Sequence, residues 1–180
     1  MCQAFPPASA PPAPRGTSNS APPPEVLREL PSARLFGSGR LRRFLFRVYD
    51  ARLWTRPGFD VARFSMEPLA LELEYGRSLL GPLIAERSIE EMRRGAAISS
   101  SQQASWLAAM QLAFPDVNEG DRMTGVQLPG VATRFFVNGK LTGEIRDAEF
   151  TRLFFGIWLG PHTSEPGLRA ALLAGGPGDS

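Results

Sequence analysis

The sequence holds few of the side chains on which disulfide and metal chemistry depend. Its 180 residues include one cysteine, Cys2, and one histidine, His162. A single cysteine cannot form an intrachain disulfide, and a histidine with no cysteine near it does not make a classical zinc site. The sequence also lacks a phosphate-binding loop and a nucleophilic triad motif. We therefore expect no metal site and no cofactor.

Charge of one sign and long apolar runs are also scarce. The 20 basic and 18 acidic residues leave a net charge of only +2. A nucleic-acid surface needs a concentrated basic patch, so we expect no nucleic-acid partner. No stretch approaches 18 apolar residues, so we expect no transmembrane segment. The N-terminus as written is not a signal peptide, so the chain as written would be cytoplasmic, but the sequence does not fix the compartment. A start codon further upstream would leave a periplasmic location open, and the sequence does not fix the oligomeric state.

Proline, alanine and serine dominate the start of the chain. Residues 1–24 contain eight prolines, and such a segment buries too little apolar surface to offset the entropy of ordering. We expect a disordered tail or linker over 1–24, one domain over 25–174, and a frayed C-terminus over 175–180.

Several segments have the composition of strands. Residues 35–39 and 41–54 are predicted strands because the second is rich in aromatic and β-branched side chains. Residues 69–75 alternate leucines with smaller or acidic residues, a pattern typical of a strand buried on one face. Another strand includes Val126 and Leu128. Residues 133–145 form the clearest hairpin, since Asn138-Gly139 suits the two positive-φ positions of a type I′ turn.

Helices are expected between and after these strands. One helix includes Ile84 to Met92, although Ser88 and Glu91 also fit a capping box that would start it later. The acidic residues Glu86, Glu90 and Glu91 are interpreted as its exposed face. The other predicted helices run from the serines at 99–101 to Pro115, from Ala148 to Leu159 behind the cap Asp147 and up to the stop Gly160, and after Ser164. The order predicts an α+β protein: an antiparallel sheet with helices on one face.

Four motifs carry a family resemblance. They are the segment Gly37-Ser38-Gly39-Arg40 leading to Val48-Tyr49-Asp50-Ala51-Arg52-Leu53-Trp54, the helix sequence from Ile84 to Met92, the hairpin Phe135-Phe136-Val137-Asn138-Gly139-Lys140, and Phe155-Gly156-Ile157-Trp158-Leu159-Gly160-Pro161. In this order they resemble the bacterial branch of the chalcone isomerase-like family, over roughly residues 30–173. The resemblance implies an open-faced β-sandwich, in which a large antiparallel sheet is packed on one side by helices, with an apolar cleft between them.

The resemblance also implies candidate site residues. The family's arginine, which holds a phenolate or carboxylate, best matches Arg40, with Arg42 as the alternative. Tyr49 matches a hydroxyl-bearing position, and Thr151 matches a Ser or Thr near the substrate. Side chains alternate along a strand, so Arg40 or Arg42 can face the cleft with Tyr49 only if a bulge or turn near Arg43-Phe44 resets the alternation. If 41–54 is one unbroken strand, Arg43 and Arg47 share the face of Tyr49 instead. The isomerases' tyrosine–asparagine pair has no counterpart on the first long helix.

Three functions follow from these observations. The leading hypothesis is a non-catalytic binding protein for a small amphipathic carboxylate or phenolic ligand, such as a fatty acid, held by Arg40 or Arg42, Tyr49 and Thr151. The alternative is an intramolecular lyase that closes the flavanone ring of a chalcone, with Arg40, Tyr49 and Thr151 as its catalytic residues. The third is a structural or interaction module whose cleft is filled by its own aromatic side chains.

Overall fold

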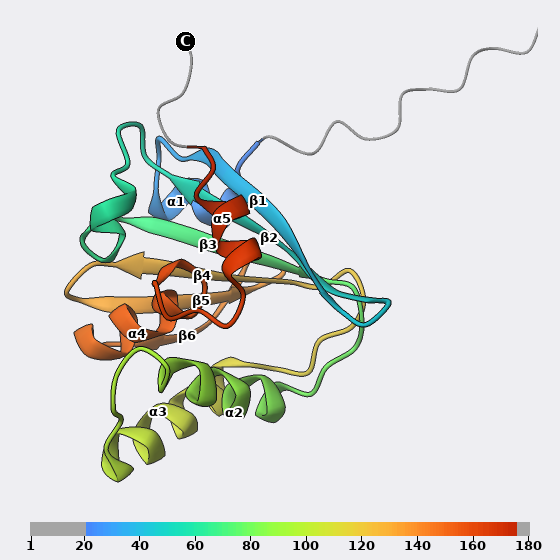
Figure 1. Cartoon of the computed structure of the whole chain (residues 1–180), viewed down its shortest axis with the longest axis vertical. Helices are drawn as coiled ribbons and strands as arrows, with labels where there is room; N and C mark the ends of the chain where they lie inside the picture. The colour runs from blue at the N-terminus through green and yellow to red at the C-terminus, as the bar shows by residue number, and fades with distance from the viewer. Residues whose placement is uncertain (1–20, 176–180) are drawn as a thin grey trace, which may run out of the picture.

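A six-stranded antiparallel sheet organises the chain, and its strands lie side by side in sequence order (Figure 1). The structure is a computed structural model that describes residues 21–175. The strands are β1 (Arg34–Arg43), β2 (Phe46–Thr55), β3 (Leu69–Tyr75), β4 (Arg122–Leu128), β5 (Ala132–Val137) and β6 (Lys140–Ile145). The helices are α1 (Pro24–Glu29), the short 3-10 helix η1 (Val61–Met66), α2 (Gly81–Met92), α3 (Ser100–Ala113), α4 (Ala148–Leu159) and α5 (Pro166–Leu172).

The helical layer covers one face of the sheet. Helices α2 to α5 pack there over a core that includes Leu53, Leu71, Phe135 and Phe155. The predicted α+β class and open-faced architecture are thereby confirmed. The predictions that fall on residues 1–20 and 176–180 lie outside the described residues. Within residues 21–175, no helix combines the length and apolar character needed to cross a bilayer.

Local capping explains where the longer helices begin. The Asp147 carboxylate accepts from the backbone N–H groups of Glu149 and Phe150, and α4 starts at the next residue, as predicted. Ser99 caps α3 in a capping box with Gln102. Helix α2 begins at Gly81, so the later start at Ser88 is wrong. The Ser88 hydroxyl lies inside the helix and donates to the Ile84 carbonyl instead.

The first hairpin turns at Phe44-Leu45, between β1 and β2. A bulge or turn was expected near this point, whereas the division of the two predicted strands at Arg40 is wrong. In the pairing of the two strands, Leu41 lies opposite Tyr49 and Arg42 lies opposite Arg47, which leaves one extra residue, Val48, on β2. This bulge lets two consecutive residues of β2 approach the same side of the sheet.

Helix α5 lies directly on β1. A Cβ added to Gly37 would stand 2.2 Å from the Leu172 carbonyl oxygen, and one added to Gly39 would stand 2.7 Å from a Leu168 methyl group. The contact at Gly37 is with backbone, so only glycine there lets the helix pack onto the strand. At Gly39 a larger residue would have to displace the Leu168 side chain. The glycines before Arg40 therefore serve the packing of a helix.

Helix α1 covers part of the opposite face and was not predicted. Its fully buried Val26 and Leu30 pack against Trp54, Ala70 and other apolar residues of the sheet. Glu25, also buried, forms an ion pair with Arg122 at 2.9 Å. This helix and neighbouring arginines shield the second face, so β3 is buried on both faces. The prediction from its alternation, a strand buried on one face only, is therefore wrong.

Candidate functional site

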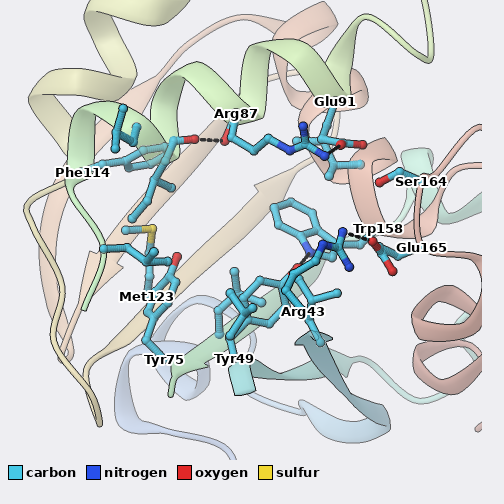
Figure 2. A pocket seen from close by; sticks show the side chains of 18 of the residues that line it. Arg43, Tyr49, Tyr75, Arg87, Glu91, Phe114, Met123, Trp158, Ser164 and Glu165 are labelled. Carbon is cyan, nitrogen blue, oxygen red and sulfur yellow. Dashed lines mark hydrogen bonds and ion pairs between the residues drawn. The ribbon is translucent and has the colours of Figure 1, made fainter. Parts of the chain in front are cut away.

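A cavity of about 480 Å³ lies between the sheet and helices α2 and α4 (Figure 2). This volume falls in the usual range for pockets that bind small molecules. Its walls are mostly apolar and include Leu41, Val48, Leu73, Leu79, Leu83, Ile84, Phe114, Met123, Phe154, Ile157 and Trp158. The polar groups at its edge are few, so each can fix the orientation of a bound molecule.

The β1–β2 hairpin supplies one wall of the cavity. Leu41 and Arg43 reach it from β1, and Val48 and Tyr49 reach it from β2. Leu41 and Tyr49 are opposite each other in the pairing, and paired residues share a face of the sheet. Alternation then places Arg43 on the Leu41 side, and the bulge at Val48 adds a second consecutive residue of β2 to the wall.

Two tyrosine hydroxyl groups lie at the sheet side of the cavity. Tyr49 and Tyr75 are opposite each other on β2 and β3, and their rings meet edge to face with centroids 6.0 Å apart. The Trp158 indole N–H donates to the Tyr49 hydroxyl at 3.0 Å. An indole nitrogen can only donate, so the Tyr49 oxygen accepts and keeps its own proton free to donate. Within residues 21–175, the structure gives the Tyr75 hydroxyl no hydrogen bond.

Burial keeps both phenols protonated. It raises the pKa of Tyr49 to about 12, against the smaller opposing effect of the Trp158 hydrogen bond. Burial also raises the pKa of Tyr75. A desolvated phenolate is costly, so both groups remain hydrogen-bond donors at neutral pH. The cavity thus offers two neutral donors in an apolar setting.

Two ion pairs stand at the edge of the cavity. Arg43 bonds to Glu165, in the loop before α5, and Arg87 bonds to Glu91 on α2 at 2.5 Å (Figure 2). The hydrogen bond with Glu165 raises the pKa of Arg43, so the guanidinium stays charged. Charges are balanced at this edge, and a ligand that binds Arg43 must take over its contact from Glu165.

Glu91 is not part of an exposed helical face, which corrects the interpretation of the acidic residues on α2. Its side chain is only 10% exposed, whereas that of Glu90 is 63% exposed. One carboxylate oxygen of Glu91 is buried and has no hydrogen-bond partner among the described residues. Glu91 also lines a smaller second cavity that includes Gly95, Gly156 and His162. It forms part of the wall between the two cavities.

Helix α4 brings an aromatic stripe to the cavity. Phe150, Phe154 and Trp158 are four residues apart, so they lie above one another on one face of the helix. Their rings are in contact, with centroids 5.4 Å apart for Phe150 and Phe154 and 5.3 Å apart for Phe154 and Trp158. This packing fixes the indole that holds Tyr49 in place.

The structure brings only Tyr49 of the predicted site residues into the cavity wall. Arg40 is opposite Asp50 in the strand pairing and forms an ion pair with it at 2.5 Å. Arg40 and Arg42 are absent from the described lining, and Arg43 takes the place expected for them. The turn at Phe44-Leu45 lies where a break was expected, but the extra residue Val48 on β2 shifts the register. Leu41 and Arg43 therefore share the face of Tyr49, and Arg40 and Arg42 do not.

Thr151 is on the side of α4 that faces the core and is not in the lining of the cavity. It is 2% exposed, and its hydroxyl donates to the Asp147 carbonyl at 2.9 Å, within its own helix. The same oxygen lies 2.9 Å from the Thr133 hydroxyl on β5. Thr151 therefore has a structural role: its hydroxyl links α4 to β5 of the sheet.

Sequence reasoning missed most of the polar lining. Tyr75 ended a strand that was correctly predicted, but its partner on the next strand could not be known without the register. Glu91 is seven residues after Ile84, two helical turns along the same face, and this spacing was the available signal. Arg43 and Glu165 are too far apart in sequence for any local pattern to pair them. Among residues 21–175, no three His, Cys, Asp or Glu side chains cluster as a metal site requires.

Comparisons with known proteins agree with this architecture. A protein of Haemophilus influenzae, described as uncharacterized, is 30% identical over 128 residues. The alignment covers 71% of this chain, and the chain spans 61% of that relative's length. The crystal structure of an Arabidopsis thaliana fatty-acid binding protein superposes with a TM-score of 0.60 at 12% identity, covering 79% of this chain and 87% of that one. Residues 30–174 match the chalcone isomerase-like family, and the chain belongs to this family.

Proposed function

We propose that this protein binds a small amphipathic acid, such as a fatty acid, in the cavity between the sheet and α2. One observation carries the proposal: inside an apolar cavity, the Tyr49 hydroxyl keeps a free proton on the same wall as Arg43. A phenol donor and a guanidinium together suit a carboxylate, which accepts hydrogen bonds at both oxygens. The apolar remainder of the cavity suits an acyl chain.

The Arg43–Glu165 ion pair does not prevent such binding. The Arg43 side chain is 47% exposed and that of Glu165 is 29% exposed, and partly solvated pairs of this kind contribute only about 0–1 kcal/mol. A ligand carboxylate replaces one carboxylate by another at the same guanidinium. Glu165 lies in the loop before α5, where it can turn to solvent.

The likeness to the Arabidopsis protein supports the same ligand class. That protein is described as a fatty-acid binding protein, and the two share the fold. Family membership alone would equally allow chalcone ring closure, in which Arg43 and Tyr49 would hold a phenolate and stabilise enolate charge. We expect the purified protein to cyclise a 2′-hydroxychalcone no faster than buffer does. An enhancement that is lost in Arg43→Gln would establish the isomerase alternative.

The ligand is tested first by native mass spectrometry of the full chain, where a co-purifying fatty acid is expected. Affinity is then measured by displacement of a fluorescent fatty acid. Arg43→Gln should weaken binding by about tenfold or more, because a hydrogen bond to a charged group is lost. Tyr49→Phe should weaken it by about fivefold, the effect of one neutral hydrogen bond.

Arg42→Gln is the matched control, because Arg42 adjoins Arg43 but faces away from the cavity lining. Its affinity should equal that of the wild type. Equal affinities for wild type, Arg42→Gln and Arg43→Gln would rule out the arginine as a carboxylate site. A protein with no bound acid and no measurable displacement would instead favour the structural or interaction module.

A further inference from the structure

Three consecutive apolar side chains project into solvent at the end of the first hairpin. Phe44 is 96% exposed, Leu45 is 89% exposed and Phe46 is 64% exposed. In Figure 1 this hairpin, drawn in blue to cyan, reaches the right-hand edge of the molecule. We call residues 44–46 the hairpin tip. A run of exposed large apolar residues is unfavourable in water and marks an interaction surface when it persists.

The backbone of the tip is strained as well. Phe44 has a φ of +55°, in the left-handed region that glycine and asparagine usually occupy. A bulky residue there adds a backbone cost to the cost of its exposed ring. Contacts within residues 21–175 do not offset either cost, because the side chain is almost fully exposed. The fold therefore provides no reason for phenylalanine at this turn.

Arginines surround the tip. Arg42 precedes it, and the Arg77 guanidinium lies 5.8 Å from the centre of the Phe46 ring. Neither Arg42 nor Arg77 has a carboxylate within ion-pair distance in the described part of the chain. Arg43 and Arg47 are also adjacent to the tip, but they pair with Glu165 and with Asp50 and Glu74. The charge left without a partner around the tip is positive.

Other exposed apolar side chains lie at the start of α2, beside the cavity. Leu80 and Leu83, at the start of α2, are 55% and 56% exposed. Leu83 lines the cavity together with Arg43, the residue that precedes Phe44. The segment at 76–77 holds this region against the hairpin, since the Gly76 amide donates to the Val48 carbonyl at 2.9 Å. The hairpin that carries the tip thus also supplies one wall of the cavity.

From this combination we infer that the hairpin tip is an anchor that inserts into the surface of an anionic lipid bilayer. Phenylalanine and leucine side chains partition into the boundary between headgroups and acyl chains. The guanidinium groups of Arg42 and Arg77, which have no carboxylate partner among residues 21–175, suit the negative headgroups above it. A protein interface would place the same side chains against a complementary surface, whereas a bilayer accommodates a short protruding apolar run with a basic collar.

Membrane anchoring by the hairpin tip does not depend on which ligand the cavity binds. An anchored tip would hold the cavity mouth at the membrane surface, where acyl chains are concentrated. The affinity of the cavity for a soluble fatty acid is measured without vesicles. Failure of membrane binding and failure of fatty-acid binding are therefore distinguishable.

The test is sedimentation of the full chain with vesicles of phosphatidylcholine alone, or mixed with about one third phosphatidylglycerol. We expect binding to the anionic vesicles, weak binding to the neutral ones, and loss of binding at high salt. The double variant Phe44→Asn, Leu45→Ser should bind at least about tenfold more weakly, because two apolar side chains no longer partition. Arg42→Gln and Arg77→Gln should each weaken binding by about fivefold.

Leu112→Ser is the matched control, because Leu112 is 87% exposed on α3, away from the tip. It should bind vesicles as the wild type does. The tip variant should be at least as stable as the wild type, since asparagine tolerates a positive φ. Absence of wild-type binding, or an equal loss in Leu112→Ser, would overturn the inference. So would a tip variant that binds vesicles normally but no longer self-associates, which would assign the tip to a second copy of the chain.

Discussion

The sheet contains two hairpins with two-residue turns, and their sequences could hardly differ more. In the β5–β6 turn, Asn138 and Gly139 have φ values of +49° and +83°. The Asn138 side chain also accepts from the Arg122 amide at 2.9 Å, so the turn is tied to β4. In the β1–β2 turn, Phe44 takes a similar φ of +55° without such a bond and with its ring in solvent.

The residues of the β5–β6 turn favour the backbone conformation that the hairpin needs, whereas Phe44 in the β1–β2 turn does not. Asparagine and glycine meet the backbone demand of a tight hairpin at little cost. Phenylalanine does not, and the surrounding strands must hold Phe44 at its positive φ. Residues that break a local rule without a structural gain are expected where the protein contacts something else.

Among substitutions at neutral pH, replacing Gly139 should produce the largest change in stability. Gly139→Val puts a β-branched residue at a φ of +83°, with its Cβ about 3.4 Å from the buried Glu25 carboxylate. We expect the free energy of unfolding to fall by about 2 kcal/mol, measured by urea denaturation. Gly156→Ala is the control, since a Cβ at Gly156 meets nothing within 4 Å and α4 gains helix propensity. A Gly139→Val protein as stable as wild type would mean that the turn has relaxed to another type.

Alkaline pH should lower the stability of the sheet next to the Phe44-Leu45 turn. Tyr49 on β2 and Tyr75 on β3 lie opposite each other there, and they are the two tyrosines of the sequence. Folding raises the pKa of Tyr49 from about 10 to about 12. The neutral phenol therefore contributes stability that is complete below about pH 10 and is lost as the pH rises toward 12. In that range the contribution falls by up to about 1.4 kcal/mol for each pH unit. Urea denaturation across this range should show a shallower decline in Tyr49→Phe; an unchanged slope would contradict the assignment.

Placing asparagine in the β1–β2 turn, as in the β5–β6 turn, should raise the stability of the protein. Phe44→Asn removes backbone strain and no buried contact, so the free energy of unfolding should rise by about 1 kcal/mol. Thermal and urea denaturation measure the change. If the variant is less stable than wild type, Phe44 packs against the protein in solution and the comparison of the two turns fails.

The smallest effect is expected on the outer face of the first hairpin. Arg40→Gln breaks the cross-strand pair with Asp50, but the pair lies at the surface and is screened by solvent. We expect no resolvable change in melting temperature and none in fatty-acid affinity, whereas Arg43→Gln on the inner face should lose affinity. A loss in Arg40→Gln equal to that in Arg43→Gln would show that both faces act on the ligand.

Elements fixed by local chemistry could be predicted from the sequence. The β5–β6 hairpin follows from Asn138-Gly139, and α4 follows from the cap Asp147 and the apolar run behind it. Both depend on residues a few positions apart. The fold class followed from the order of such elements together with the family resemblance.

The facing of the arginines could not be predicted in the same way. It depends on a single extra residue, Val48, on the partner strand, and one residue of register exchanges the two faces of a strand. Helix α1 was missed for a different reason. Pro24 continues the proline-rich composition before it, and only contacts with distant strands show that Val26 and Leu30 are core residues. In both cases the deciding contacts are remote in sequence.

The seating of α5 on the glycines of β1 bears on how the chain is assembled during synthesis. Every strand pairs with its neighbour in sequence, so the sheet can grow as the chain leaves the ribosome. Helix α5 is made after all six strands, yet it rests on the backbone of the first one at Gly37 and Gly39. This contact closes nearly the whole domain into one loop, and such distant contacts form slowly. Until then the face of β1 at Gly37 and Gly39 lacks the helix that covers it, so the newly made chain is open to wrong packing on this edge strand before its last helix docks.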